Sequence, residues 1–109
     1  MEKIMVDNPD GYRLAAYLFM PAGVCLAMVI VAHGFRGSKE NGGKICGFAS
    51  RLNDRGLGVL AFDFSGSGES GGDFTDVTIS RQAADLKRVI DYAARHYRVP
   101  LVLLGRSLG

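Results

Sequence analysis

Three stretches of the chain are apolar without alternation, and two helical patterns separate them. The apolar stretches cover residues 26–32, 58–63 and 101–104. Unbroken apolar runs of this length are typical of strands that are covered on both faces. The order of strand, helix, strand, helix, strand predicts a parallel sheet in an α/β fold, with the helices as crossovers.

The two helical patterns differ in length. The first ends before Gly56, where a residue in the left-handed conformation is expected, and its apolar face carries Ile45, Phe48, Ala49 and Leu52. The second follows Thr78, a candidate N-cap. Its apolar stripe comprises Ile79, Ala83, Leu86, Ile90 and Ala93. The residues predicted to face away are Arg81, Lys87, Asp91 and Arg95.

The first 20 residues follow a different pattern. Two strand-like segments, 4–6 and 12–19, flank the turn-forming residues 8–11. This arrangement predicts an antiparallel hairpin or meander ahead of the parallel strands. No linker, repeat or low-complexity tract interrupts the chain, so residues 1–109 are expected to form a single α/β domain.

Charge and composition narrow the classes of partner. Lys and Arg number 13 and Asp and Glu 11, a net charge of +2 without a long basic run, which argues against nucleic acid. The longest apolar run, residues 24–32, is too short to span a membrane, and the start lacks a leader pattern, so a cytoplasmic protein is predicted. Cys25 and Cys46 are expected to be small buried hydrophobes. No metal or cofactor is predicted.

The chain ends on a G-x-S-x-G pattern that directly follows an apolar strand: Gly105, Ser107 and Gly109. A nucleophile elbow needs this context, because it holds a serine on a tight turn between a strand and a helix. Ser107 is therefore a candidate nucleophile. The alternative is an ordinary Gly-Ser turn after a buried strand.

A second loop follows the strand at residues 26–32 and begins His33-Gly34-Phe35. A tetrahedral oxyanion needs backbone N–H donors from two segments, and the amides of Phe35 and Leu108 are the candidates. His33 is expected to tie down the loop rather than to act as a base. Arg36 and Lys39 are expected to be solvated loop residues rather than anion ligands.

A third loop, after the strand at residues 58–63, contains G-x-G-x-x-G at Gly66, Gly68 and Gly71. In a dinucleotide fingerprint the third glycine opens a helix, and an acidic residue about 20 positions on ends the next strand. Here Gly71 lies well before Thr78, and the acid at that distance, Asp91, lies inside a predicted helix. The pattern therefore argues against a nucleotide cofactor.

Together these loops resemble those of the α/β-hydrolase family, over essentially the whole chain. Their motif residues are, in order, His33, Gly34 and Phe35, then Asp63, Gly66, Gly68 and Ser70, then Gly105, Ser107 and Gly109. The chain is most similar to cytosolic cinnamoyl- or feruloyl-esterase-type and serine-aminopeptidase-like hydrolases. The resemblance implies the N-terminal half of that fold, ending at the elbow, with the motif residues other than Ser107 and Phe35 shaping the loops.

The resemblance also implies an activity. Ser107 would attack a carboxylic ester and form an acyl-enzyme, with Phe35 and Leu108 supplying the oxyanion-hole amides. In the family the triad acid and histidine follow the serine, whereas His33 and His96 precede Ser107. The 109 residues alone are therefore expected to be inactive. Arg106 departs from the histidine that is frequent at this position in the family.

The expected partner is a small-molecule ester or acyl substrate, not nucleic acid or a membrane. In the family's sheet, the strand at residues 101–104 would lie at an exposed edge of this chain and favour self-association. Two other functions stay open. One is a non-catalytic hydrolase-like fragment or partner-binding scaffold, and the more remote one is a nucleotide-binding oxidoreductase.

Overall fold

The computed structural model describes residues 1–7, 13–33, 39–40, 43–64, 70 and 79–105. The described elements are, in chain order, β1 (Glu2–Asp7), β2 (Arg13–Phe19), β3 (Ala27–Ala32), α1 (Ile45–Asn53), β4 (Leu57–Phe62), α2 (Ile79–Tyr97) and β5 (Leu101–Gly105).

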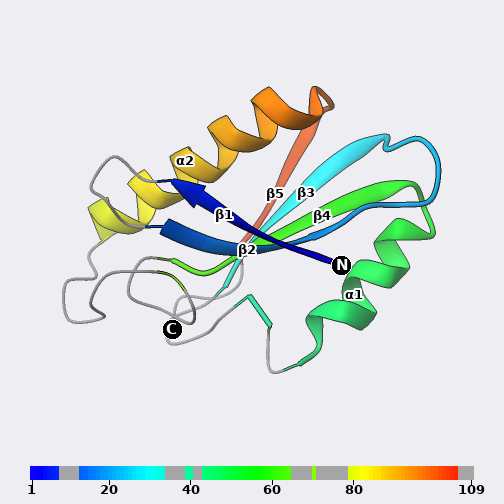
Figure 1. Cartoon of the computed structure of the whole chain (residues 1–109), viewed down its shortest axis with the longest axis horizontal. Coiled ribbons are helices and arrows are strands. Elements are labelled where there is room, and N and C mark those ends of the chain that lie inside the picture. The colour runs from blue at the N-terminus through cyan, green and yellow to red at the C-terminus, as the bar shows by residue number, and fades with distance from the viewer. Residues whose placement is uncertain (8–12, 34–38, 41–42, 65–69, 71–78, 106–109) are drawn as a thin grey trace.

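The five strands form one mixed sheet in the order β1-β2-β4-β3-β5 (Figure 1). β1 pairs antiparallel with β2, which pairs antiparallel with β4. β3 lies between β4 and β5 and is parallel to both. This topology confirms the predicted α/β class, with antiparallel strands first and parallel strands after them.

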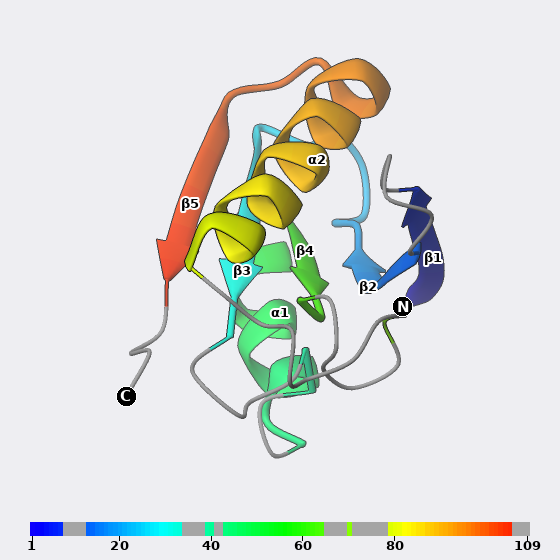
Figure 2. The ribbon, with the colours of Figure 1, turned by 90° about the vertical axis from the view of Figure 1, so that its left-hand side faces the viewer.

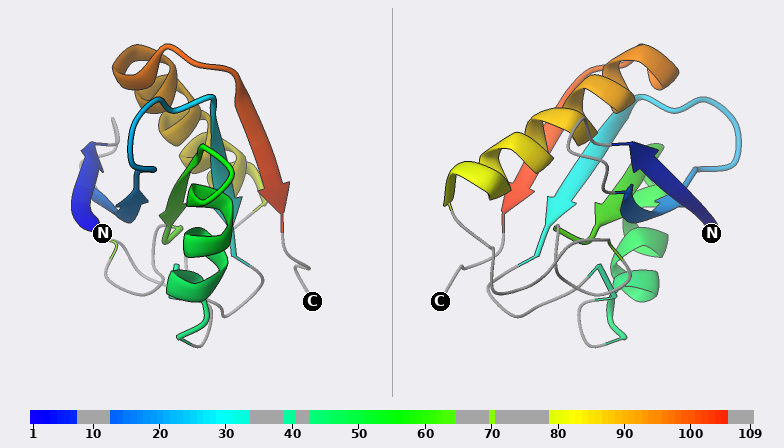
Figure 3. Two further views of the ribbon diagram at one scale, coloured as in Figure 1. Left: turned by 90° about the vertical axis from the view of Figure 1, so that its right-hand side faces the viewer. Right: turned by 60° about the vertical axis from the view of Figure 1, so that its left-hand side comes forward.

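The two helices cover opposite faces of the sheet (Figure 3). Successive side chains of a strand point to opposite faces, so one strand supplies both sides of the core. In β3, Val29 and Val31 pack in the cluster that contains α1 residues, whereas Met28 and Ile30 pack in the cluster that contains α2 residues. Cover on both faces explains why the central strands read as unbroken apolar runs.

α2 packs most of its predicted stripe against the sheet, because Ala93 is buried and Leu86 and Ile90 pack against the core. Its buried face also includes residues outside that stripe. Asp85, Val89 and Ala93 are buried, one helical turn apart, whereas Ala83 is exposed. The prediction for Ala83 is wrong because alanine fits an apolar stripe but loses little by facing water.

No helix in the described ranges is long and apolar enough to cross a membrane.

The turn between α1 and β4 depends on Gly56, whose φ is +80°. A Cβ atom here would lie 3.1 Å from Leu26 Cδ1, and the Gly56 carbonyl accepts a 2.8 Å hydrogen bond from the Leu26 amide. Glycine is favoured in this conformation because it has no side chain to clash. The predicted left-handed residue after α1 is confirmed.

The two cysteines differ in burial. Cys25 is half-buried and its thiol lies 3.2 Å from the Ala27 carbonyl, but Cys46 is exposed. Ile45 and Ala49 are the buried residues of α1, and the next residue along a helix points about 100° away. The expectation of burial for Cys46 is therefore wrong.

Candidate active site

Three neighbouring strands, β4, β3 and β5, end in register at one end of the sheet, which we call its carboxyl-terminal edge. In the pairing of Cα atoms, Ala32 of β3 lies opposite both Phe62 of β4 and Gly105 of β5. Paired residues of adjacent strands lie about 5 Å apart. The C-terminal ends of β3, β4 and β5 therefore lie side by side, and His33 and Asp63 directly follow two of them. Open α/β sheets bind their ligands at this edge.

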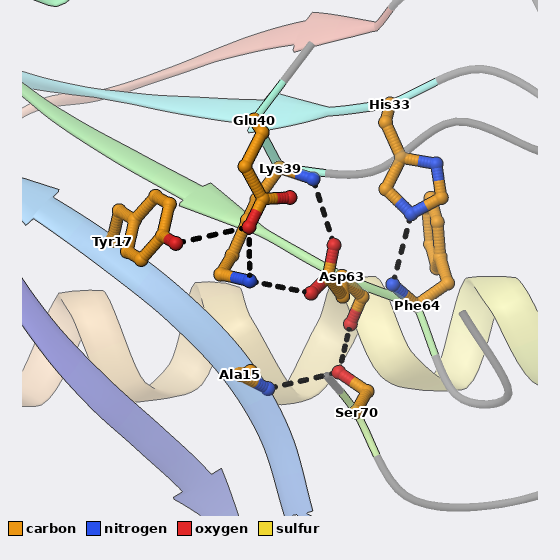
Figure 4. A network of polar contacts seen from close by, with 8 residues as sticks. All are labelled: Ala15, Tyr17, His33, Lys39, Glu40, Asp63, Phe64 and Ser70. Atoms are coloured by element: carbon orange, nitrogen blue, oxygen red, sulfur yellow. Dashed lines mark hydrogen bonds and ion pairs between the residues drawn. The ribbon is translucent and has the colours of Figure 1, made fainter. Parts of the chain in front are cut away.

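Asp63, directly after β4, is the centre of a buried polar network (Figure 4). Its carboxylate accepts two hydrogen bonds from Lys39, 2.7 Å from the backbone N–H to Oδ1 and 2.8 Å from Nζ to Oδ2. Its own N–H donates to the Ala15 carbonyl at 2.8 Å, and its carbonyl accepts from Ser70 Oγ at 2.6 Å. We call the residues drawn in Figure 4 the Asp63 network: Ala15, Tyr17, His33, Lys39, Glu40, Asp63, Phe64 and Ser70.

Lys39 is buried, so the expectation of a solvated loop residue is wrong. The side chains of Lys39 and Asp63 are both 0% exposed. Lys39 Nζ also donates to Glu40 Oε2 at 2.9 Å and lies 4.4 Å from the centre of the Tyr17 ring, while the Tyr17 hydroxyl donates to the same Glu40 oxygen. An isolated buried carboxylate would be very costly, and the lysine compensates the charge of Asp63.

His33 connects the end of β3 to the residue after Asp63. The His33 side chain is buried and Nε2 accepts a 3.1 Å hydrogen bond from the Phe64 N–H. A backbone N–H can only donate, so Nε2 carries no proton and a neutral His33 has its proton on Nδ1. The ring also packs edge-to-face on Phe64, with centroids 5.0 Å apart. In this arrangement the Nε2 lone pair is engaged and not free to take a proton from a serine.

Ser70 joins this edge to the antiparallel part of the sheet. Its hydroxyl donates to the Asp63 carbonyl and accepts a 2.8 Å hydrogen bond from the Ala15 N–H of β2. One hydroxyl can do both because oxygen carries lone pairs as well as a proton. A serine at this position of the loop therefore has a structural reason that does not involve catalysis.

His96, the second histidine, lies on the exposed surface near the end of α2. Its ring stacks on Tyr92 with centroids 3.9 Å apart, and Nδ1 lies 2.8 Å from the Tyr92 carbonyl. α2 ends shortly before β5 begins, so His96 lies near the start of β5 and Gly105 lies at its other end.

Within the described residues, no group of three or more His, Cys, Asp and Glu side chains could hold a metal ion.

Several predicted residues lie outside the described residues: Gly34, Phe35, Arg36, Gly66, Gly68, Gly71, Thr78, Arg106, Ser107, Leu108 and Gly109. Of the predicted site residues, the structure brings together His33, Asp63 and Ser70 and places Gly105 at the end of β5. Sequence reasoning missed Lys39, Glu40 and Tyr17. The position of Asp63 was a usable signal, because an acid directly after a strand covered on both faces needs a cation nearby.

This geometry agrees with comparisons with known proteins. The chain matches the family described as serine aminopeptidase, S33, over residues 25–109. This match covers well over half of the chain, so the protein belongs to this family of serine hydrolases with the α/β-hydrolase fold. No curated protein matches the chain.

Solved structures with the same fold include several esterases. Est1E from Butyrivibrio proteoclasticus, determined with ferulic acid bound, matches with a TM-score of 0.85 and 33% identity, over 95% of this chain and 42% of Est1E. A putative hydrolase from Agrobacterium vitis matches with a TM-score of 0.76 and 31% identity, over 97% of this chain and 40% of its own. A Xanthomonas campestris serine hydrolase without a lid shares the fold, with a TM-score of 0.81 and 24% identity, over 99% of this chain and 51% of its own. The chain therefore spans about half or less of each of these proteins.

Proposed function

We propose that this chain is the N-terminal half of a serine hydrolase that cleaves carboxylic esters through an acyl-enzyme on Ser107. The observation that carries the proposal is the pairing of Ala32 with Gly105 in parallel strands. Ser107 is two residues from Gly105 and Phe35 three residues from Ala32. The nucleophile and one oxyanion donor therefore start from adjacent positions at the ligand-binding edge of the sheet.

In the proposed reaction, Ser107 Oγ attacks the ester carbonyl carbon and loses its proton to a base. The oxyanion accepts hydrogen bonds from the backbone amides of Phe35 and Leu108 until the alcohol leaves with a proton. Water then hydrolyses the acyl-enzyme and regenerates the serine. His33 Nε2 is bonded to the Phe64 amide and His96 is far from this edge, so we place the triad acid and histidine outside these 109 residues. The chain alone is then inactive.

The proposed substrate is a small ester or other acyl compound. Est1E, the relative with 33% identity, was solved with ferulic acid, the acid component of a feruloyl ester. Neither nucleic acid nor a membrane enters the proposal, because the net charge is only +2 and no long basic run is present. A cytoplasmic location is part of the same proposal.

The test is to label the full-length product of the gene with a fluorophosphonate probe. We expect one covalent adduct, located at Ser107 by peptide mapping and absent from Ser107→Ala. Ser50→Ala is the matched control, because Ser50 is exposed on α1 and lies outside the three motif loops. A folded protein that takes no label, or takes it at another serine, would refute the proposed nucleophile.

The exposed side of β5 favours a second candidate, a non-catalytic scaffold that binds a partner. Val102, Leu103 and Leu104 are 50%, 53% and 39% exposed, which is unusual for three consecutive apolar strand residues. A scaffold would bind its partner equally well with Ser107→Ala and would not react with the probe. The labelling experiment therefore separates the two candidates.

A further inference from the structure

The two residues that flank the segment 34–38 are both bound to consecutive residues at the end of β4. His33 binds Phe64, and Lys39 binds Asp63. We propose that Lys39 is a positioning residue for the oxyanion hole: together with His33 it fixes both ends of the segment that carries Phe35. This inference rests on the proposed function, because Phe35 matters only if its amide stabilises an oxyanion.

Lys39 is held in orientation as well as in place. Its backbone N–H and its side-chain Nζ bind the two different oxygens of one carboxylate, at 2.7 and 2.8 Å. Two bonds from separate parts of one residue restrict both the path of the chain and the direction of the side chain. Burial strengthens this restriction, because water cannot compete for an ion pair whose side chains are both 0% exposed.

Asp63 can serve as an anchor because it is itself fixed to the centre of the sheet. Its N–H donates to Ala15 of β2, and Ser70 Oγ bridges the Asp63 carbonyl and the Ala15 N–H. The next residue, Glu40, accepts a hydrogen bond from the hydroxyl of Tyr17, which is also on β2. Lys39 is therefore held in place through contacts with residues on or next to two strands, β2 and β4, and not by a surface loop.

Such an anchor matters to a group that acts through geometry. Oxyanion donors are effective only when they are held within about 0.5 Å of the productive position. A chain of five residues with both ends fixed has far fewer conformations than a free loop. A buried ion pair adds little net stability compared with apolar residues, so a positional role accounts for it better than a stabilising role.

The test uses the full-length gene product and three variants. Lys39→Met removes the cation and leaves Asp63 buried without it, so this variant can lose stability. Lys39→Met combined with Asp63→Asn removes both charges and keeps a backbone N–H facing an amide oxygen. Lys44→Met is the matched control, because Lys44 is an exposed lysine just before α1.

Three quantities are measured for each protein. They are kcat per site titrated with fluorophosphonate and KM, both for a p-nitrophenyl ester, and the affinity for a trifluoromethyl ketone, which forms a tetrahedral adduct. For the double variant we expect kcat per site to fall by about 10- to 100-fold, KM to change by less than about 2-fold, and ketone affinity to fall in parallel with kcat/KM. Lys44→Met should match the wild type.

The outcomes separate the two proposals. A wild type that takes no label at Ser107 would refute the proposed function, and the positioning role with it. A labelled wild type with a double variant of unchanged kcat per site and unchanged ketone affinity would overturn only the positioning role. Fewer titratable sites with normal kcat per site, or complete failure of the double variant to fold, would show that the pair serves folding and would overturn it as well.

Discussion

β4 and β5, the two strands that pair in parallel with β3, are both apolar but differ in how far they are buried. β4 is buried from Gly58 to Phe62, and a polar network continues from its end. β5 is equally apolar, but Val102, Leu103 and Leu104 are 39% to 53% exposed. It is the outermost strand on its side of the sheet (Figure 2). The comparison shows that an apolar run specifies a strand but not the cover that the strand receives.

The difference has a structural cause. β4 has strand neighbours on both sides and packs against α1, whereas β5 has only β3 beside it and few contacts with α2. Exposed apolar edges can pair with other chains. Single substitutions around β4 should therefore lower the free energy of unfolding, whereas substitutions in β5 should mainly change self-association.

The largest expected effect is at Asp63. Asp63→Ala in the full-length protein removes the carboxylate that binds both the backbone N–H and the Nζ of Lys39, and leaves the buried lysine with Glu40 as its ion-pair partner. The free energy of unfolding should fall by about 3–5 kcal/mol in urea denaturation. The matched control is Asp54→Ala, because Asp54 is exposed after α1, and its effect should stay within about 0.5 kcal/mol. Equal effects of the two substitutions would contradict the central role of the Asp63 network.

A pair of leucines compares the two strands directly. Leu60→Ala in β4 should cost about 2–5 kcal/mol, because Leu60 is fully buried and its removal leaves a cavity. Leu103→Ala in β5 should cost less than about 1 kcal/mol in the 109-residue chain, since half of that side chain already faces water. Similar losses in urea unfolding at both positions would show that β5 is covered as well as β4.

The outer part of the Asp63 network should respond more weakly than its centre. Tyr17→Phe removes the 2.9 Å hydrogen bond to Glu40 but keeps the ring over Lys39. We expect a loss of about 0.5–1.5 kcal/mol, the usual value for one hydrogen bond. Chemical denaturation measures it, and a loss as large as that of Asp63→Ala would contradict the greater importance of Asp63.

A charged residue on β5 should have the smallest effect on stability and a clear effect on self-association. We expect the 109-residue chain to self-associate through β5, and Leu103→Lys to reduce this association while changing the free energy of unfolding by less than about 0.5 kcal/mol. Size-exclusion chromatography with light scattering measures both proteins. A wild-type chain that runs as a monodisperse monomer would contradict the prediction.

The fold was predictable from sequence because its strands and helices follow the pattern of apolar residues. The runs at residues 26–32, 58–63 and 101–104 predict β3, β4 and β5 to within a residue at each end, and Gly56 adopts the expected left-handed conformation in the turn after α1. What pattern alone could not give is the burial of charge. The sequence predicts a solvated Lys39, but this lysine is buried and binds Asp63, which is 24 residues away in the chain.

The candidate site was predictable only in part. The glycine-containing motifs identify which loops matter, since they follow the strands at the edge where ligands bind. They do not show how the loops are fixed, because the contacts among Lys39, Asp63 and Tyr17 depend on the order of β2, β4 and β3 in the sheet. Sheet order is a property of the folded chain and has no local signal in the sequence.

The most direct test of the proposed function is to trap the acyl-enzyme. The full-length protein is mixed with p-nitrophenyl acetate, quenched in acid within the first turnover and mapped by mass spectrometry. The account predicts a burst of p-nitrophenol and an acetyl group on the peptide that contains Ser107, both absent from Ser107→Ala. A folded protein that gives no burst and no acetylated Ser107 would contradict it.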